Sequence, residues 1–447
     1  MRILKIFPIV IALISITCSG DPMNPNDRQI TFPDSNFESL IREVLDIPTG
    51  EITRGDMSVI TELDCNSREI SDLSGIGYCT NLTNLNLEFN QVNDLSPLSG
   101  LINLDWLNAH YNEISDLSPL SELTNLEYLS INNNQIDDLN PLSSLANLKE
   151  VYLGFNQISD PSPLSGLVQL TGLDLVWNDI SDISSLSELT NLEYLSINNN
   201  QIEDLSPLSG MASMRWLSFH TNEIVNLSPL SGMTNLDYLN ISFNQISDLV
   251  PISKLIKISF LEMYGNQIVD IRSLSGMNYM RELRLGDNQI IDISALSGMT
   301  NMQHLDMRDN QIVDLSPLSE MENLLILTLW RNQIIDVDPL ASLINLERLN
   351  LWANQIIDID QFTALTNLFD LGLGDNQIIE ISSLSELTEL KYLSLKDNQI
   401  NDIKPLVDNT GLNQDDLIYL SGNPLSDLSI NTYIPVLRDR GVDVEWP

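Results

Sequence analysis

An asparagine returns every 22 residues along most of this chain, without a single insertion. A period this rigid indicates that each repeat is one small structural unit that packs on its two neighbours, because a unit of that length cannot bury its apolar face alone. The chain therefore grows as a linear stack, and its 447 residues need not divide into two or three globular domains. The fifteen copies are Asn90, Asn112, Asn134, Asn156, Asn178, Asn200, Asn222, Asn244, Asn266, Asn288, Asn310, Asn332, Asn354, Asn376 and Asn398.

Each position of the repeat has a structural role. Leu85 and Leu87 alternate with polar residues, which predicts a strand with one buried face. Stacked strands then form one parallel sheet over a continuous apolar core. The amide of Asn90 is expected to satisfy buried backbone groups at the end of the strand and to bridge neighbouring repeats. Ser96-Pro97-Leu98 predicts a short helical turn, with the serine as its cap and the proline at its first position.

The frame L-x-x-L-x-L-x-x-N-x-I-x-D-L-S-P-L covers residues 82–403 and resembles that of internalin-type bacterial leucine-rich repeat surface proteins. The predicted fold is an α/β solenoid: a curved leucine-rich-repeat array with one parallel β-sheet on its concave face, a helical N-terminal cap and an α/β C-terminal cap. The resemblance implies a domain that binds proteins on the concave face and has no catalytic activity.

The repeats divide the chain into five predicted units. They are a signal peptide at 1–17, a tether at 18–30, an N-terminal cap with a degenerate first repeat at 31–81, the fifteen 22-residue repeats at 82–403 and a C-terminal cap at 404–447.

The two caps are expected to cover the ends of the apolar core, as a solenoid requires. Ser35-Asn-Phe-Glu38 is predicted to be a capping box that opens a helix, and Thr53-Arg-Gly-Asp56 to cap a second short helix leading to a strand at Leu63. A helix is also predicted from Ser429 to Arg440, followed by a final strand at 442–444. The expected inward faces consist of Phe37, Leu40, Ile41, Val44 and Leu45 in the first helix and Ile430, Ile434 and Leu437 in the last.

The N-terminus has the pattern of an export signal. Arg2 and Lys5 precede an apolar run that is too short to be a stable membrane anchor. The segment that ends at Cys18 resembles a bacterial lipobox, in which the cysteine is lipidated, although Ser15 and Thr17 depart from the usual pattern. We expect an exported protein, either a cell-surface or outer-membrane lipoprotein held only through Cys18 or a secreted protein.

The chain is strongly acidic, with 62 acidic and 21 basic residues and a formal net charge of −41. This balance argues against nucleic acid and anionic membrane surfaces as partners. The position four after each repeated asparagine is Asp in thirteen repeats, with Asn226 and Glu380 as exceptions. A single-file row of carboxylates does not converge on one ion as calcium requires, so we expect these residues to accept backbone N–H bonds. No cofactor or metal is predicted.

Cys65 and Cys79 occupy inward positions of the first repeat. Their places favour two buried thiols, because each stands where a leucine stands one repeat later. A disulfide across this repeat is the alternative in an exported protein.

No enzyme motif is visible, so the informative positions are those six, four and two before each repeated asparagine. They alternate with the core leucines and must face solvent on the concave sheet. Aromatic and arginine side chains there indicate a binding surface, since these residues dominate binding hot spots. The alternatives are a surface for carbohydrate and aromatics that merely favour strands. The candidate ligand-binding residues, which include one arginine directly before a repeated asparagine, are Trp106, Tyr128, Tyr194, Trp216, Tyr238, Phe260, Arg284, Arg308, Trp330, Arg331, Arg348 and Trp352.

Two regions of this face differ in chemistry. One is a predicted aromatic stripe from Tyr194 to Phe260 in a single column, and the other combines the four arginines with Trp330 and Trp352. Our hypothesis is that the two tryptophans anchor the ligand while the arginines orient it. Alternatively, the arginines only neutralise Asp306, Asp309 and Asp370. We expect a monomer with a protein ligand, or else a polysaccharide. His110 and His220 lie five repeats apart, too far to share a zinc ion.

Overall fold

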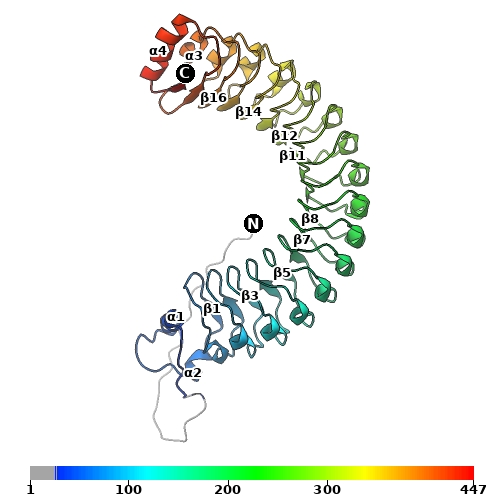
Figure 1. The fold of residues 1–447 in the computed structure, drawn as a ribbon, viewed down its shortest axis with the longest axis vertical. Coiled ribbons are helices and arrows are strands. Elements are labelled where there is room, and N and C mark those ends of the chain that lie inside the picture. Colours follow the sequence, from blue (N-terminus) through cyan, green and yellow to red (C-terminus); the bar gives the residue numbers. More distant parts are fainter. Residues whose placement is uncertain (1–25, 27, 447) are drawn as a thin grey trace.

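The computed structural model describes residues 26 and 28–446, which form a single curved solenoid with an 18-stranded parallel sheet along its inner face (Figure 1). Each strand pairs with the next one in the sequence. The strands are β1 (Glu62–Asp64), β2 (Asn84–Asn86), β3 (Trp106–Asn108), β4 (Tyr128–Ser130), β5 (Glu150–Tyr152), β6 (Gly172–Asp174), β7 (Tyr194–Ser196), β8 (Trp216–Ser218), β9 (Tyr238–Asn240), β10 (Phe260–Glu262), β11 (Glu282–Arg284), β12 (His304–Asp306), β13 (Ile326–Thr328), β14 (Arg348–Asn350), β15 (Asp370–Gly372), β16 (Tyr392–Ser394), β17 (Leu417–Tyr419) and β18 (Asp443–Glu445).

Short 3₁₀ helices form the outer, convex side of the array (Figure 1). Asp94 accepts the backbone N–H of Ser96 at 2.8 Å, and Ser96 makes no side-chain cap, so the prediction that the serine caps this turn was wrong. The helices are η2 (Ile76–Tyr78), η3 (Ser96–Leu98), η4 (Ser118–Leu120), η5 (Asn140–Leu142), η6 (Ser162–Leu164), η7 (Ser184–Leu186), η8 (Ser206–Gly210), η9 (Ser228–Gly232), η10 (Val250–Ile252), η11 (Arg272–Leu274), η12 (Ser294–Leu296), η13 (Ser316–Leu318), η14 (Asp338–Ser342), η15 (Asp360–Ala364) and η16 (Ser382–Glu386).

The core is one continuous column of leucine, isoleucine and methionine side chains between the sheet and the 3₁₀ helices. It runs from Ile30 to Val444. The constant register of 22 residues, as in the pairing of Leu195 with Leu217, places equivalent side chains directly over one another. Because every repeat buries its leucines against the next, burial is shared along the whole array.

The repeated asparagines form the predicted ladder at the carboxyl ends of the strands. The Nδ2 group of Asn244 donates to the carbonyls of Phe219 and Ile241 at 3.1 and 3.2 Å, and its Oδ1 accepts the N–H of Ile224 at 2.9 Å. Phe219 and Ile224 belong to the preceding repeat, so each amide joins two repeats. The expectation that these amides satisfy buried backbone groups is confirmed, and Asn423 extends the ladder into the C-terminal cap.

A second row of asparagines, which the sequence analysis did not identify, joins the repeats before the strands begin. Nine residues before ten of the fifteen ladder positions, the amide of an asparagine donates to a carbonyl 23 residues earlier. The other five positions hold Gln169, Ser213, Lys257, Tyr279 and Glu389. Asn103 donates to Thr80 at 2.9 Å, and Asn345 donates to Glu322 at 2.8 Å. These amides are exposed, so the two ladders differ in their surroundings.

The N-terminal cap consists of α1 (Ser35–Leu45) and α2 (Arg54–Met57). Asp34, not Ser35, is the cap of α1, and its carboxylate accepts the N–H groups of Asn36 and Phe37. The inward face contains Phe37, Leu40 and Ile41, whereas Val44 is exposed, contrary to our expectation. The predicted capping box at Thr53 is present, and β1 contains Leu63 as predicted.

The C-terminal cap contains α3 (Lys404–Asp408), a π-helical turn η17 (Ser429–Tyr433) and α4 (Ile434–Asp439), followed by β18. Ile434 and Leu437 are buried as predicted, but Ile430, which lies in the π turn, is only half-buried. Helix α4 is followed by Gly441, whose φ of 91° is the left-handed conformation expected after a helix.

Cys65 and Cys79 are both free and buried, as the first interpretation held. Burial raises the pKa of the Cys79 thiol to about 12, so the group is an unreactive thiol at neutral pH. The predicted signal peptide and Cys18 lie outside the described residues, and the proposed limits of the five units stay a prediction. Among the described residues, no helix has the length and apolar character needed to cross a bilayer.

Candidate functional site

Six aromatic rings form a continuous band across the first half of the concave face. Trp106 stacks on Tyr128 with ring centroids 5.0 Å apart. Further along, Trp216 stacks between Tyr194 and Tyr238 at 4.4 and 4.6 Å. Where two rings stack, each covers part of the face of the other.

The two groups of rings are joined by Tyr152, which the sequence analysis did not select. Tyr152 lies 5.5 Å from the ring of Tyr128 and 6.4 Å from that of Tyr194. It belongs to the column four before the ladder, but its hydroxyl reaches the neighbouring column, within 3.9 Å of where a Cβ of Gly172 would be. The glycine leaves room for the ring to cross the sheet. Stacking contacts among the described residues end at Tyr238, so Phe260 continues the column without joining the stack.

A half-buried carboxylate lies beside this band. Asp174 sits in the same column as Tyr152, and its Oδ1 accepts the N–H of Val176 at 2.9 Å. Burial raises the pKa of Asp174 to about 6, and the hydrogen bond from Val176 opposes this shift only in part. Burial also raises the pKa of Tyr194 and Tyr238 to about 12, which keeps both hydroxyls protonated.

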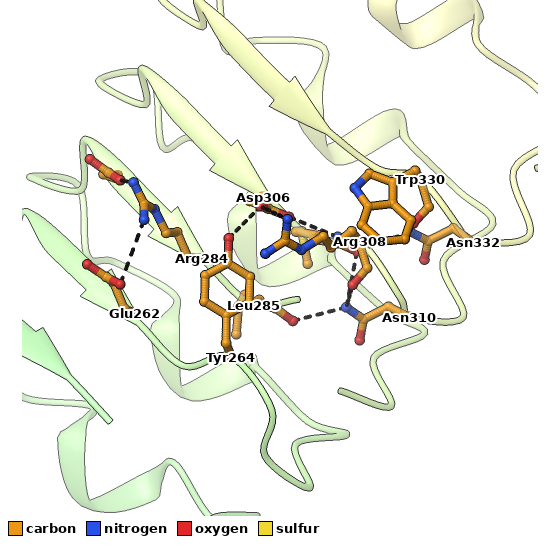
Figure 2. A network of polar contacts seen from close by, with 11 residues as sticks. Glu262, Tyr264, Arg284, Leu285, Asp306, Arg308, Asn310, Trp330 and Asn332 are labelled. Carbon is orange, nitrogen blue, oxygen red and sulfur yellow. Dashed lines mark hydrogen bonds and ion pairs between the residues drawn. The ribbon is translucent and has the colours of Figure 1, made fainter. Parts of the chain in front are cut away.

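The second half of the face carries an alternating stack of arginines and aromatic rings, which we call the cation–π cluster: Tyr264, Arg308, Trp330, Arg331 and Trp352. Figure 2 shows Tyr264, Arg308 and Trp330. The guanidinium of Arg308 lies 4.8 Å from the ring centroid of Tyr264 and 5.5 Å from that of Trp330. The guanidinium of Arg331 lies 4.9 and 5.2 Å from the rings of Trp330 and Trp352. The predicted proximity of these arginines to the tryptophans is therefore present, and Tyr264 adds a third ring.

Carboxylates hold the arginines in place. Arg308 lies 3.7 Å from Asp306, which also accepts the hydroxyl of Tyr264 and the backbone N–H of Arg308 (Figure 2). Arg331 lies 3.4 Å from Asp309. Arg284 pairs with Glu262 and Glu282. The acids are the more buried partners, while the arginines are 39–55% exposed. The arginines therefore neutralise carboxylates of this chain and remain available to a ligand, because their guanidinium groups are the more exposed partners.

A cavity of about 280 Å³ opens beside the cluster on the concave face. Its walls combine charged and neutral polar groups: Tyr264, Glu282, Arg284, His304, Asp306, Arg308 and Thr328, with Leu305 and Ile326 as apolar members. His304 lies 3.6 Å from Glu282. The cavity has the size to accept one or two side chains of a partner.

Arg348 does not join the cluster. Its guanidinium lies 5.1 Å from the ring of Phe369, at the side where the chain enters the strands. There a larger groove of about 770 Å³ is lined mostly by amide, hydroxyl and charged side chains. Asp370, the proposed partner of Arg348, is half-buried, and burial raises its pKa while Arg348 lowers it.

A row of exposed rings, the aromatic ridge, lies along the edge of the face directly before the ladder. Its members are Phe89, Tyr111, Phe155, Trp177 and Phe243, and two pairs stack: Phe89 on Tyr111 at 4.7 Å and Phe155 on Trp177 at 5.8 Å. Every residue at this position has a φ between 51° and 57°, which costs about 1 kcal/mol or more for a bulky residue. Sequence reasoning selected Arg331 at this position but missed the ridge, because it looked for aromatic residues only at the alternating positions.

Glycines let several rings lie flat across the next repeat. A Cβ on Gly286 would meet the ring of Tyr264 at 2.6 Å, and one on Gly374 would meet Trp352 at 2.6 Å. Gly265 stands in the same relation to Phe243. The spacing of an aromatic residue and a glycine 22 residues later is the signal that would have identified these rings in the sequence.

The described residues contain no group of three or more His, Cys, Asp or Glu side chains arranged to hold a metal ion. The ring of His110 contacts the carbonyl of Asn132 and packs edge-on against Phe89 and Tyr111. The ring of His220 contacts the hydroxyl of Thr221.

Family models of leucine-rich repeats match several parts of the chain. The model described as "Leucine Rich repeats (2 copies)" matches residues 102–144, 168–210, 280–320 and 322–365. A "Leucine rich repeat" model matches 344–400, and a further one matches 78–95 and 232–249. Among curated proteins, none matches the chain.

Solved structures share the fold along most of the array. The internalin InlF of Listeria monocytogenes is 34% identical, with 77% of this chain and 96% of that one covered and a TM-score of 0.65. The functional domain of InlJ from Listeria monocytogenes, described as including a cysteine ladder, is 24% identical over 87% of this chain and 81% of its own, with a TM-score of 0.67. A plant peptide hormone receptor, RGFR1 in complex with RGF2, is 19% identical over 88% and 67%, with a TM-score of 0.72.

Proposed function

This chain belongs to the internalin-type leucine-rich repeat proteins, and we propose that it is a non-enzymatic protein of the cell surface or the extracellular space that binds a protein ligand on its concave face. Leucine-rich repeat domains are typically binding scaffolds, and the plant receptor similar in fold was solved with a peptide hormone. We further propose that the protein is exported and that Cys18 is its lipid anchor.

The cation–π cluster is the observation that carries the proposal. Trp330 lies half-buried between Arg308 and Arg331, and Trp352, also half-buried, lies beyond Arg331. Tyr264 and Arg308 of the same cluster line a cavity that can receive side chains. Tryptophan and arginine are the residue types most enriched in binding hot spots, because they combine a large contact area with directed polar groups. A partner with acidic and apolar groups side by side would meet the outer layer of guanidinium groups and then the rings.

Replacing both tryptophans tests this site. The Trp330→Ala, Trp352→Ala double variant should lose about 2 kcal/mol or more of binding free energy toward the protein that wild type captures from an array of extracellular domains. Titration calorimetry on the captured partner measures the loss. A thermal melt should show that the fold is retained, since neither ring is part of the core.

A matched pair of tryptophans outside the cluster serves as the control. Trp106→Ala combined with Trp177→Ala removes the same side chains from the first half of the array and should leave the affinity unchanged. If instead the control loses binding and the Trp330, Trp352 variant does not, the site lies on the aromatic band or on the aromatic ridge.

Carbohydrate binding is a second candidate, and the aromatic ridge favours it. The rings of Phe155 and Trp177 are exposed, and the column beside them carries the exposed amides of Gln157 and Gln201 with the carboxylate of Asp179 between them, polar groups that suit sugar hydroxyls. A glycan array separates the two functions. Saccharide binding that disappears in a Phe155→Ala, Trp177→Ala variant, with no protein captured, would replace our first proposal.

A further inference from the structure

An exposed row of branched aliphatic side chains runs along one flank of the second half of the array. These residues stand three positions after the ladder, where the chain leaves the concave sheet and turns toward the convex side. Six consecutive repeats contribute one member each, and every member is 46–55% exposed. The members of this aliphatic stripe are Val269, Ile291, Val313, Ile335, Ile357 and Ile379.

The fold itself does not require an aliphatic residue there. In six consecutive repeats of the first half, the same position is polar, with Asn93, Ser115, Asp137, Ser159, Ser181 and Glu203. Both halves share the same ladder and the same register, so either type of residue suits the local backbone. Contiguous apolar surface on a soluble protein generally marks a contact site, since its exposure to water is unfavourable.

The rows beside the stripe indicate the charge of what covers it. On one side, at the position directly after the ladder, lie six exposed glutamines from Gln267 to Gln377, 22 residues apart. On the other side lie six exposed acids: Asp270, Asp292, Asp314, Asp336, Asp358 and Glu380. Asp270 pairs with Arg272 of the same chain, whose hydrogen bond lowers the pKa of Asp270 to about 2. The other five acids have no ion-pair partner among the described residues, and the hydrogen bond from the N–H of Ser294 lowers the pKa of Asp292, which stays ionised at neutral pH.

A row of acids along an apolar stripe is complementary to an apolar face with a row of cations beside it. A second copy of this chain would bring a further net charge of −41, and an anionic membrane would be repelled by the same row. The stripe spans five inter-repeat steps, about 24 Å, which is the length of a helix of about 16 residues.

We propose that the aliphatic stripe is a docking site for a cationic amphipathic helix, whose apolar face covers the stripe while its Lys or Arg side chains pair with the acidic row. This site is separate from the concave face. Helix-in-groove and helix-on-stripe recognition both rest on apolar anchors at helical spacing, and the cationic row fixes the orientation of the helix.

The test uses a synthetic helix of about 18 residues, built from Leu and Lys with one apolar face, and the purified protein. Ile335→Ser combined with Ile357→Ser converts two stripe positions to the residue found at Ser159 and Ser181. We expect the affinity measured by fluorescence anisotropy to fall about tenfold or more. The control is Ile102→Ser combined with Ile344→Ser, two equally exposed isoleucines outside the stripe, which should leave the affinity unchanged.

Charge is tested separately with Asp314→Asn and Asp336→Asn. The chain itself shows that asparagine can serve there, because Asn226 accepts the N–H of Ser228 at 2.9 Å in the same way. This double variant should weaken binding several-fold and reduce its dependence on salt. Asp116→Asn with Asp138→Asn is the matched control in the first half.

Each of the other outcomes overturns the proposal. A scrambled peptide of the same composition that binds equally well would show attraction to a polyanion only. If wild type dimerises and the Ile335, Ile357 variant does not, the stripe is a contact between copies. If wild type binds phosphatidylcholine vesicles and that variant does not, the stripe binds a lipid surface. No binding of the helix by wild type also rejects it. The Trp330→Ala, Trp352→Ala variant should bind the helix normally, which separates this proposal from that for the concave face.

Discussion

Single residues in this array act on two repeats at once. The side chain of Asn244 closes the end of its own strand and also satisfies an N–H and a carbonyl of the preceding repeat. The period identified this role, because a buried amide recurring every 22 residues has few other uses. The exposed second row, with Asn103 as an example, was missed because a surface asparagine in a loop has many possible partners.

Asn244→Ala in the middle of the array should cost about 1–3 kcal/mol of unfolding free energy, because it leaves buried backbone groups without partners. Asn90→Ala near the end should cost less, since only the first repeats need to open there. Urea melts of both variants measure the difference. Equal stability of Asn244→Ala and wild type would contradict the buried-ladder argument.

Asp174 should make stability depend on pH. Burial raises its pKa in the folded state to about 6, above the value of about 3.9 in an unfolded chain, so the folded state disfavours the charged form. The stability that this carboxyl contributes is therefore full below about pH 4 and is lost as the pH rises through 6. Asp174→Asn should be about 1–3 kcal/mol more stable than wild type at pH 7, and this gain should vanish near pH 4. Urea melts at the two pH values test the sign, and a gain independent of pH would reject this account.

At the scale of elements, the strands were predictable and the side-chain contacts between them only partly so. Alternation of leucine with polar residues assigns the strand, and the 22-residue period fixes its neighbours, so the columns follow from the sequence alone. The rotamer of an aromatic side chain does not follow from the sequence. Tyr152 crosses to the adjacent column because Gly172 leaves room, and Arg348 turns toward Phe369 instead of Trp352. Phe155 also has a left-handed backbone, which the sequence does not indicate because a bulky residue is not expected in that conformation.

The cap helix α1 shows how a capping role can shift by one residue. One carboxylate oxygen of Asp34 accepts the N–H groups of Asn36 and Phe37, and the other accepts those of Ser71 and Asp72 in the first repeat. Asp34→Ala should therefore cost about 1–2 kcal/mol and loosen both the helix and its attachment to the array. Ser35→Ala should cost little. Hydrogen exchange along α1 compares the two variants. Equal protection of α1 in both would contradict the assignment of Asp34, and not Ser35, as the cap.

Across the whole molecule, the chemistry of the surface changes midway. The first half presents stacked rings, amides and hydroxyls, while the second half presents the cation–π cluster on the concave face and the aliphatic stripe on one flank. One scaffold thus carries several surfaces that do not share residues, because each column of the repeat is an independent row.

Anchoring is also a property of the whole molecule. If Cys18 carries lipid, wild type should partition with membranes and the Cys18→Ala variant should be released into the medium. Fractionation of expressing cells, followed by immunoblotting, measures the two pools. Equal release of both proteins would leave export without an anchor at Cys18.

The uniform register gives the molecule a unit of length. Each 22-residue step moves the chain by one strand spacing, about 4.8 Å, and leaves every row in line. Gain or loss of one complete repeat between Tyr238 and Tyr264 would change the separation of the aromatic band from the cation–π cluster by that amount while altering neither. By gaining or losing complete repeats, an evolving chain of this kind can change the distance between two binding surfaces in fixed steps and so match it to a partner.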